Sequence, residues 1–459
     1  MPANKIARFS VVLAVLGLGV GYAQEPPLPR FAEPGAPLPA LDQIQPVLGD
    51  GQLGEPEPVP AEAVLEPIPH RGTSIAVLEQ LALQNNPTVQ QAAHAAEALR
   101  GKYVQVGLRP NPEVGYVGEE INDEGTLGQQ GAFFSQKFIT GGKLHLNRNV
   151  VGHEIAAAEF AWQAQSMRVT NDVRAAAYRV LAAQRKAELI GELVRIGAEG
   201  RKAAEDLLRA KEVSKVDVLQ ARVEENSARM ELENAQKDYL AKWREMAVTV
   251  GMPDLETAPI TDRLTSDLPE LTWEQSVAQL LENSPELARA YAQIERANCD
   301  VARQCAGQVP DFDVEAAVRH NLASDETVAS VRVGVPLQLF DSNQGNIHRA
   351  QAELTAAHQE ARRVELELQK RLAGAFNQYA VAKTRAERYK KSILPDAGAS
   401  LELLRDGYRQ GEYSYLDLLT AQRTFFRVNL AYVESLRDVW ISSVAIDGLL
   451  LTGGLDAAP

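Results

Sequence analysis

One motif occurs twice in this chain, 200 residues apart. Residues 206–221 read DLLRAKEVSKVDVLQA and residues 406–421 read DGYRQGEYSYLDLLTA. Such self-similarity at a fixed distance indicates an internal duplication, in which each half forms one structural unit. The identical positions are Asp206, Arg209, Glu212, Ser214, Asp217, Leu219 and Ala221, which match Asp406, Arg409, Glu412, Ser414, Asp417, Leu419 and Ala421.

Further landmarks divide the chain into segments. Residues 1–23 are typical of a signal peptide, since Lys5 and Arg8 precede an apolar run that is too short to span a bilayer. Residues 24–71 are rich in proline and predict a flexible leader without helix or central strand. We predict a first repeat over 72–253, a linker over 254–271, a second repeat over 272–454 and a tail over 455–459.

The region just before the first motif predicts one very long helix. Residues 143–209 contain no proline, and Ile155, Trp162, Val169, Ala176, Ala183 and Ile190 recur every seven residues, with a second series offset by four. This heptad seam is typical of helices that pack along partner helices. A helix of this length would be about 100 Å long, more than a single globular domain uses.

The motif itself predicts a reversal into a second helix. Ser214 and Asp217 have the spacing of a capping box, so a new helix is expected to begin there and to run to about residue 250. The second half repeats the plan over residues 345–410 and 414–450. Pro395 and Gly398 interrupt the second long helix, where we expect a kink or local break.

Alternating patterns ahead of each long helix predict β-strands with one apolar face. The patterns cover residues 312–319 and 329–335 in the second half and, more weakly, 113–119 and 132–139 in the first half. An acidic loop over residues 120–130 joins the weaker pair. Each half therefore reads helix, β-hairpin, long helix, reversal, helix.

Four such strands suit a membrane β-barrel but cannot close one alone. An open sheet edge in lipid leaves backbone groups unsatisfied at several kcal/mol each, so other copies must supply the remaining strands. Three copies would give 12 strands. The predicted fold is therefore mainly α with a membrane β-barrel contribution: a coiled-coil α-barrel of long helices, plus four strands per chain that close a 12-stranded barrel in a trimer.

Composition argues against several classes of function. A net charge of −14 disfavours nucleic acid as a partner, because nucleic-acid binding needs a basic surface. The only cysteines, Cys299 and Cys305, lie six apart on a predicted helix and are expected to be two buried thiols on different faces. We find no metal-ligand spacing, P-loop, dinucleotide fingerprint or Ser-His-Asp pattern, so we expect no cofactor, no bound metal and no enzyme activity.

Several motifs in both halves resemble the TolC-like outer-membrane efflux factors, and the likeness covers nearly all of residues 73–454. Residues 335–345, VPLQLFDSNQG, look most similar to the CzcC-like heavy-metal branch of that family. The other motifs that carry the resemblance are LQNNP at 83–87, LLENSP at 280–285, GGK at 141–143, YRQGE at 408–412 and DLLTAQ at 417–422.

The resemblance implies a homotrimeric duct in the outer membrane of a Gram-negative-type cell, with its helical barrel in the periplasm. It also implies a periplasmic adaptor protein and an inner-membrane pump as partners, the pump being of the resistance-nodulation-division type in the metal branch. The family's adaptor contacts lie at the periplasmic tip, where the two reversals sit. In this sequence they match Ala210, Lys211, Glu212, Gln410, Gly411 and Glu412.

The resemblance also implies which residues form the periplasmic entrance. Asp417 matches a position where three copies would make an anionic ring that favours cations, and Thr420 replaces the second acidic residue of that ring. Asp217 and Tyr408 match positions that tether neighbouring helices in the closed state. Both aspartates also fit plain helix capping. Lys211 replaces the glycine usual in the first turn, which leaves the backbone conformation there open.

Other interpretations of the sequence remain. A soluble periplasmic coiled-coil scaffold or adaptor would explain the long helices but not the paired amphipathic strands. The predicted duct would export small molecules or metal ions, and a duct for proteins, the exit of a type I protein secretion system, would explain both features as well. The sequence does not reveal the transported substrate.

Overall fold

The computed structural model describes residues 72–121, 128–265, 267–410 and 412–455. The predicted signal peptide and leader, most of the loop in the first β-hairpin and Gly411 lie outside these residues. No helix in the described part of the chain contains an apolar stretch that could cross a membrane.

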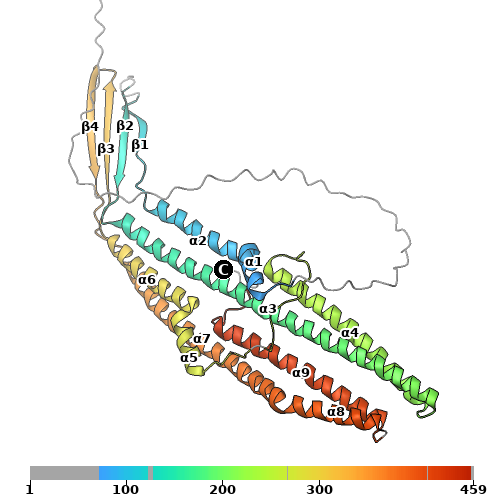
Figure 1. Ribbon diagram of the computed structural model, residues 1–459. Coiled ribbons are helices and arrows are strands. Elements are labelled where there is room, and N and C mark those ends of the chain that lie inside the picture. Colours follow the sequence, from blue (N-terminus) through green and yellow to red (C-terminus); the bar gives the residue numbers. More distant parts are fainter. Residues whose placement is uncertain (1–71, 122–127, 266, 411, 456–459) are drawn as a thin grey trace, which may run out of the picture. The chain divides into compact units, whose positions relative to one another are not determined.

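Both halves show the same order of elements (Figure 1). Each has two short helices, a β-hairpin, a long helical segment and a returning helix. The first half consists of α1 Ile75–Asn85, α2 Pro87–Val106, β1 Glu113–Glu119, β2 Gln129–Phe138, α3 Lys143–Ala210 and α4 Lys215–Val250. The second half consists of α5 Trp273–Asn283, α6 Pro285–Ala306, β3 Phe312–Asn321, β4 Glu326–Gly334, α7 Gln344–Arg388, a π-helical turn η3 Tyr389–Ile393, α8 Leu394–Arg409 and α9 Tyr415–Asp447.

The first long helix is continuous over 68 residues. Its heptad seam is buried at Val169, Val173 and Val180, as the pattern predicts. Trp162 departs from the prediction, since 43% of its surface is exposed. A straight α-helix drifts by about 20° per heptad relative to a seven-residue repeat, so a seam that is buried at one end rotates away at the other.

The second long helix is interrupted, as the proline predicts. At η3 the N–H of Leu394 donates to the carbonyl of Tyr389, one residue further back than in an α-helix. Pro395 follows in the first turn of α8. Its ring would clash with the carbonyl of Lys391 in a regular helix, so the wider turn just before it removes that clash.

The four strands form one antiparallel sheet in the order β1-β2-β3-β4. The pairing of β2 with β3 joins the two halves, with Phe134 opposite Ala316 and Gln136 opposite Val314. Within the described residues, the outer edges of β1 and β4 have no strand partner. All four predicted strands are present, but three differ in their bounds: β2 and β4 begin three residues earlier than predicted, Ile139 and Val335 lie outside them, and β3 extends to Asn321.

The sheet has one apolar and one polar face. The register places small and apolar side chains together on one face, and several of them, such as Val331 at 73%, are largely exposed in the single chain. The opposite face carries ion pairs, including Arg319 with Glu119. The apolar side chains of this face are Val114, Tyr116, Ala132, Phe134, Phe138, Phe312, Val314, Ala316, Val318, Ala329, Val331 and Val333.

The main core lies among the helices, where the two halves pack on each other. The long helix α3 contacts α2 and α6 towards the sheet, and α4 and α9 further along (Figure 1). Leu78, Val180, Trp243 and Leu436 are buried in one cluster with residues from both repeats. The Trp243 Nε1 donates to the carbonyl of Leu255 at 3.1 Å, which satisfies the polar atom of this buried ring.

A segment over residues 448–454 ties the second half to α3 of the first. Asn171 Nδ2 donates to the carbonyls of Gly448 and Leu451, at 2.9 and 2.8 Å. The backbone N–H groups of Gly453 and Gly454 donate to the Asp172 carboxylate. These bonds join residues that are about 280 positions apart, and Asn171 is almost fully buried.

The prediction of two buried thiols is wrong. Both cysteines lie on α6 and both are free thiols, but Cys305 is exposed and Cys299 is half-buried. Cys305 sits in the last turn of the helix, just before Gly307, where few neighbours cover it. The six-residue spacing correctly separates the two side chains around the helix but does not predict which face is covered.

Candidate functional site

The two helical reversals, residues 210–214 and 410–414, carry the predicted docking residues. The first connects α3 to α4 and the second connects α8 to α9, at the ends of the helices remote from the sheet (Figure 1). The side chains of the described docking residues are exposed at both reversals, namely Ala210, Lys211, Glu212, Gln410 and Glu412. The structure thus makes these residues accessible to a partner, and their docking role stays a prediction.

Lys211 takes up the left-handed conformation at the first reversal, with φ 62° and ψ 25°. The N–H of Glu212 donates to the carbonyl of Leu207 at 2.9 Å, and the N–H of Lys211 donates to that of Leu208 at 3.0 Å. This is the hydrogen-bond pattern of a Schellman motif, which usually has glycine at the left-handed position. At the second reversal the N–H of Glu412 makes the equivalent bond to Gly407 at 2.8 Å.

Both motif aspartates cap the helices that follow the reversals. The Asp217 carboxylate accepts the N–H of Ser214 at 2.9 Å, and the Asp417 carboxylate accepts that of Ser414 at 3.1 Å. Each serine Oγ in turn accepts the aspartate N–H, so both capping boxes are complete. Hydrogen bonds from the Ser414 side chain and backbone hold the pKa of Asp417 below its ordinary value. Asp417 is nevertheless exposed, so capping leaves it open to ions.

The four predicted entrance residues fall into two groups. Tyr408 lies against Tyr415, with ring centroids 6.0 Å apart, and burial together with the nearby Asp217 raises the pKa of its hydroxyl. Asp417 and Thr420 lie one turn apart and exposed on α9, with Thr420 Oγ1 donating to the carbonyl of Leu416. The structure thus brings Tyr408 close to Asp217, and places Asp417 and Thr420 on one helix.

An ion pair that the sequence analysis missed joins the two helical hairpins. Arg423 of α9 donates to Glu224 of α4, beside a cavity of about 680 Å³ that is also lined by Tyr408 and Tyr415. Glu225 is buried next to it and pairs with Arg201. No periodic signal could have revealed the pairing of two charges 199 residues apart on exposed helix stretches.

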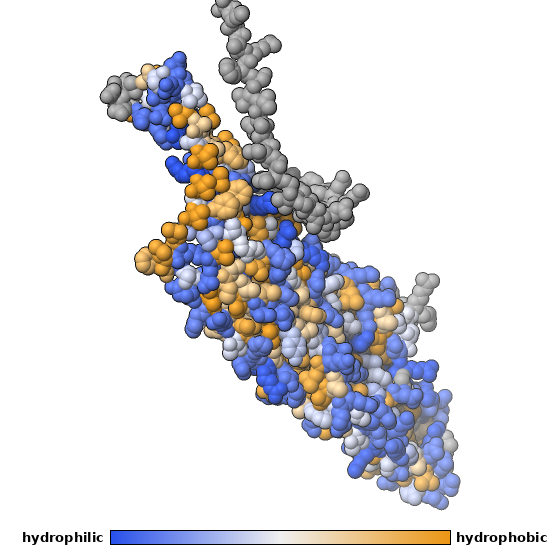
Figure 2. All heavy atoms as spheres, turned by 90° about the vertical axis from the view of Figure 1, so that its left-hand side faces the viewer, coloured by the Kyte–Doolittle hydropathy of each residue, from blue (hydrophilic) through white to orange (hydrophobic). Residues whose placement is uncertain are grey.

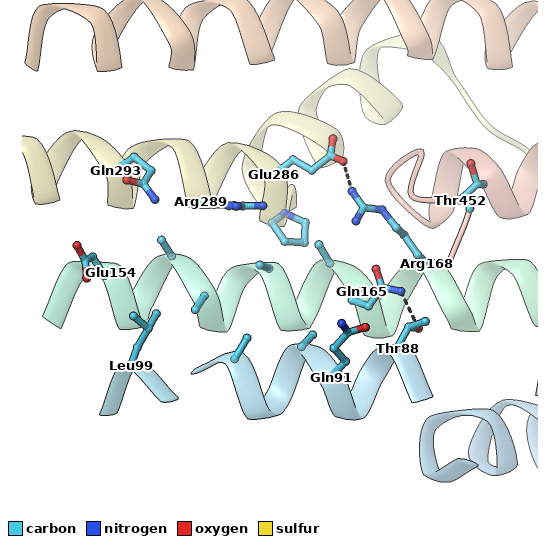
Figure 3. A pocket seen from close by; sticks show the side chains of 18 of the residues that line it. Thr88, Gln91, Leu99, Glu154, Gln165, Arg168, Glu286, Arg289, Gln293 and Thr452 are labelled. Atoms are coloured by element: carbon cyan, nitrogen blue, oxygen red, sulfur yellow. Dashed lines mark hydrogen bonds and ion pairs between the residues drawn. The ribbon is translucent and has the colours of Figure 1, made fainter. Parts of the chain in front are cut away.

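A second polar cluster lies between α2, α3 and α6, around a pocket of about 820 Å³ (Figure 3). Glu286 of α6 accepts from Arg168 of α3 at 2.7 Å and from Arg371 of α7 at 2.9 Å. Gln165 donates to Thr88 across the same pocket. The bond from Arg168 to Glu286 crosses from the first repeat to the second, whereas the other two join helices within one repeat. Among the described residues, no group of three or more His, Cys, Asp or Glu side chains could hold a metal ion.

Comparison with known families explains the duplicated architecture. The family model described as "Outer membrane efflux protein" matches the chain twice, over residues 78–251 and 277–450. The chain belongs to the outer membrane efflux protein family. The two matches agree with the predicted tandem repeat, and both contain one β-hairpin, one long helical segment and one reversal.

Individual relatives of this efflux protein agree with the family. The cobalt-zinc-cadmium resistance protein CzcC of Cupriavidus metallidurans is 28% identical over 376 residues, which are 81% of this chain and 88% of CzcC. A crystal structure of CusC has a TM-score of 0.68 at 17% identity and covers 83% of this chain and 93% of that one. The outer membrane protein VceC of Vibrio cholerae has a TM-score of 0.64 at 18% identity, covering 82% and 96%.

These matches confirm the resemblance, the fold class and the location predicted from the sequence. The efflux protein is an outer membrane channel with its helices in the periplasm, and it is not an enzyme. The alternative of a soluble periplasmic scaffold is therefore wrong. The family does not distinguish one cargo from another.

Proposed function

We propose that the chain forms a homotrimeric exit duct for metal cations, which docks on a periplasmic adaptor and an inner-membrane pump of the resistance-nodulation-division type. The observation that carries this proposal is the match to CzcC, which extends over most of both chains and whose name specifies cobalt, zinc and cadmium resistance. The structure adds three supporting features: the sheet, the entrance and the tip.

The sheet supports assembly into a trimer. Its apolar face suits lipid, but the unpaired edges of β1 and β4 would leave backbone N–H and C=O groups without partners there. Pairing β4 of one copy with β1 of the next satisfies both edges. Three copies then give a closed 12-stranded barrel, a size known among membrane barrels.

The charge of the proposed entrance residues supports the proposal that the cargo is cationic. In a trimer, Asp417 would contribute three carboxylates around one axis, and its low pKa keeps it ionised at neutral pH. A ring of carboxylates attracts cations. Thr420, Tyr408 and Asp217 complete the proposed entrance, with the Asp217 carboxylate near the Tyr408 hydroxyl.

The tip supports docking on an adaptor. Each chain presents two exposed reversals, so a trimer presents six, and both carry a glutamate at the same position, Glu212 and Glu412. We propose Ala210, Lys211, Glu212, Gln410, Gly411 and Glu412 as the docking residues. Alanine replacement of both glutamates should weaken adaptor capture without altering the amount of channel in the membrane.

A growth experiment tests the cargo. A deletion strain should lose tolerance to cobalt, zinc or cadmium and should regain it with the wild-type gene, while tolerance to antibiotics stays unchanged. If the deletion strain tolerates these metals as well as the parent, the metal proposal fails. Loss of a secreted protein instead would favour the type I secretion alternative.

The size of the detergent-extracted protein tests assembly independently of cargo. Light scattering coupled to size exclusion should give three times the mass of one chain. A monomer in mild detergent would contradict the trimer and, with it, the closed barrel.

A further inference from the structure

The pocket between α2, α3 and α6 is rich in arginine, although the chain as a whole has a net charge of −14. Four guanidinium groups and two carboxylates line it. They belong to Arg168, Arg289, Arg296, Arg371, Glu154 and Glu286. A hollow lined mainly by one sign of charge concentrates ions of the opposite sign, so this pocket attracts anions.

Both carboxylates of the pocket already have partners within the chain. Glu286 accepts from Arg168 and from Arg371. Glu154 forms an ion pair with Lys102 at 2.6 Å. The carboxylates are therefore engaged elsewhere and do not neutralise the two arginines that remain.

The two remaining arginines lie on one side of α6. Arg289 and Arg296 are seven residues apart, which is about two turns of an α-helix. Figure 3 shows Arg289 and Gln293 on the side of α6 that faces α3. The Nε of Arg296 donates to Gln293 Oε1 at 2.9 Å. Among the described residues, neither Arg289 nor Arg296 forms an ion pair, so both guanidinium groups can bind an anion from outside the chain.

Small apolar side chains form the floor of the pocket. Ala157 and Ala164 of α3 line it and are almost fully buried. When α3 and α7 are counted from their first residues, the matching positions of α7 hold the larger His358 and Glu365. The alanines thus leave room for a volume of about 820 Å³, which is within the range of small-molecule sites.

We infer that this pocket binds an amphiphilic organic anion, whose carboxylate or phosphate group pairs with Arg289 and Arg296 while its apolar part covers the alanines. Arginine binds both groups through paired N–H bonds. A metal cation is repelled by the same arginines. The site goes beyond the proposed function, because all of its residues belong to one chain and it depends neither on the cargo nor on the trimer.

The pocket is too far from the sheet for a membrane lipid to reach. Arg296 and Arg289 precede the end of α6 at Ala306 by 10 and 17 residues, or about 15 and 25 Å. The polar layer on each side of a bilayer is only about 5–8 Å thick. Figure 2 shows hydrophobic residues gathered where the sheet meets the helices, and hydrophilic residues over most of the same face further along. The ligand is therefore a free molecule of the periplasm.

Binding of the anion should stabilise the contact between the two repeats. The pocket is built from α2 and α3 of the first repeat and from α6 of the second. A ligand that binds only the folded wall raises its stability in proportion to the logarithm of the ligand concentration. The midpoint of thermal unfolding should therefore rise as the ligand is added.

Titration of the full-length protein in a nonionic detergent tests the chemical class of the ligand. Octyl phosphate should bind and raise the midpoint of thermal unfolding. Inorganic phosphate should bind at least about tenfold more weakly, because it lacks the apolar part, and octyltrimethylammonium should not bind. Equal binding of either control probe overturns the assignment of an amphiphilic anion.

Substitution of the two arginines tests the site itself. Arg289→Gln with Arg296→Gln should weaken binding of octyl phosphate at least about tenfold, because two charge-assisted contacts are lost. Arg244→Gln is the matched control, since Arg244 is exposed on α4 and forms no ion pair among the described residues. It should leave the affinity unchanged. If the double variant binds as the wild type does, the site is not in this pocket.

A second substitution keeps the test sharp if the double variant does not fold. Ala161→Leu fills part of the floor and removes no charge, so it should also weaken binding. An unchanged affinity in this variant overturns the role of the apolar floor. The oligomeric state is measured before each titration, and a monomer that binds octyl phosphate supports the site while contradicting the trimer.

Competition with a lipid distinguishes the two sources of an amphiphilic anion. Phosphatidylglycerol added to the detergent solution should not displace octyl phosphate, because the membrane lies too far from the pocket. Displacement by this lipid would show that a membrane lipid fills the pocket and would overturn the periplasmic source.

Discussion

At the scale of single residues, the first reversal holds a lysine in a conformation that favours glycine. Lys211 has φ 62° and closes a complete Schellman motif. A side chain other than glycine in the left-handed region costs roughly 1 kcal/mol. We therefore expect Lys211→Gly to slow amide exchange at the first reversal about fivefold, as mass spectrometry of peptides around residues 207–214 would show.

A matched glycine elsewhere on the same helix supplies the control. Lys202 is exposed and lies inside α3 with helical geometry, so Lys202→Gly should destabilise the helix by about 0.5–1 kcal/mol and speed exchange. If Lys211→Gly and Lys202→Gly changed amide exchange in the same direction and to the same extent, Lys211 would not be strained.

The capping carboxylate of α9 gives a prediction about pH. Hydrogen bonds from Ser414 lower the pKa of Asp417 below its ordinary value of 3.8. The cap is therefore fully formed above that value and is lost as the pH falls through the lower folded value. Acid should speed proteolysis at the second reversal in the wild type, and Asp417→Asn should remove this pH dependence. A wild type and a variant that respond alike would refute the role of the carboxylate.

Local residue chemistry could be predicted where it depends on near neighbours in sequence. The capping boxes at Ser214 and Ser414 follow from a Ser-x-x-Asp spacing, and the structure confirms both. The exposure of Cys305 and the pairing of Arg423 with Glu224 depend on which helices pack together. No pattern within one helix contains that information.

At the scale of elements, Pro395 makes the two long helices unequal. The π-turn before it provides one wide turn in α7–α8, whereas α3 is continuous at the equivalent position, Arg195. We expect Pro395→Ala to allow a regular helix and to slow amide exchange over residues 389–395. Arg195→Pro should do the reverse in α3, at a cost of about 3 kcal/mol or more.

These two variants also separate local from global effects. Exchange should change over about two turns around the replaced residue and should stay the same in the other long helix. If Pro395→Ala leaves exchange over residues 389–395 unchanged, some feature other than the proline ring sustains the π-turn.

The helices and strands were largely predictable, because the spacing of apolar residues and the absence of proline distinguish long helices from strands. The prediction for the first long helix ends within one residue of the structure, and β1 has the predicted bounds. The error at Val335 is informative. Alternation continues past Gly334, but among the described residues of the single chain no strand pairs with the positions that follow.

At the scale of the whole molecule, the apolar sheet face distinguishes a membrane protein from a soluble one. Val331 is exposed on that face, and Ser330 lies on the polar face beside it. A lysine on a lipid-facing strand position costs about 2–4 kcal/mol at mid-membrane and little in water. Val331→Lys should therefore reduce the amount of trimer in the outer membrane fraction, whereas Ser330→Lys should not. Equal yields of both would argue against a lipid-facing sheet.

Assembly was predictable in outline because four strands with two open edges demand partners. The cargo was not, because no group of three or more His, Cys, Asp or Glu side chains among the described residues could hold a metal ion, and the proposed entrance residues Asp417 and Thr420 would select by charge alone. The pocket around Glu286 was also invisible in the sequence, since it is built from α2, α3, α6 and α7 at once.

The hydrogen bonds between α3 and residues 448–454 can form only after the second repeat has been exported. Asn171 and Asp172 acquire their partners from glycines and a leucine that leave the export machinery about 280 residues later. Until then these partners are absent, so the contacts that bury Asn171 in the complete chain cannot form. Prematurely terminated chains would thus lack the hydrogen bonds that tie residues 448–454 to α3. We expect periplasmic proteases to degrade such chains before they reach the outer membrane.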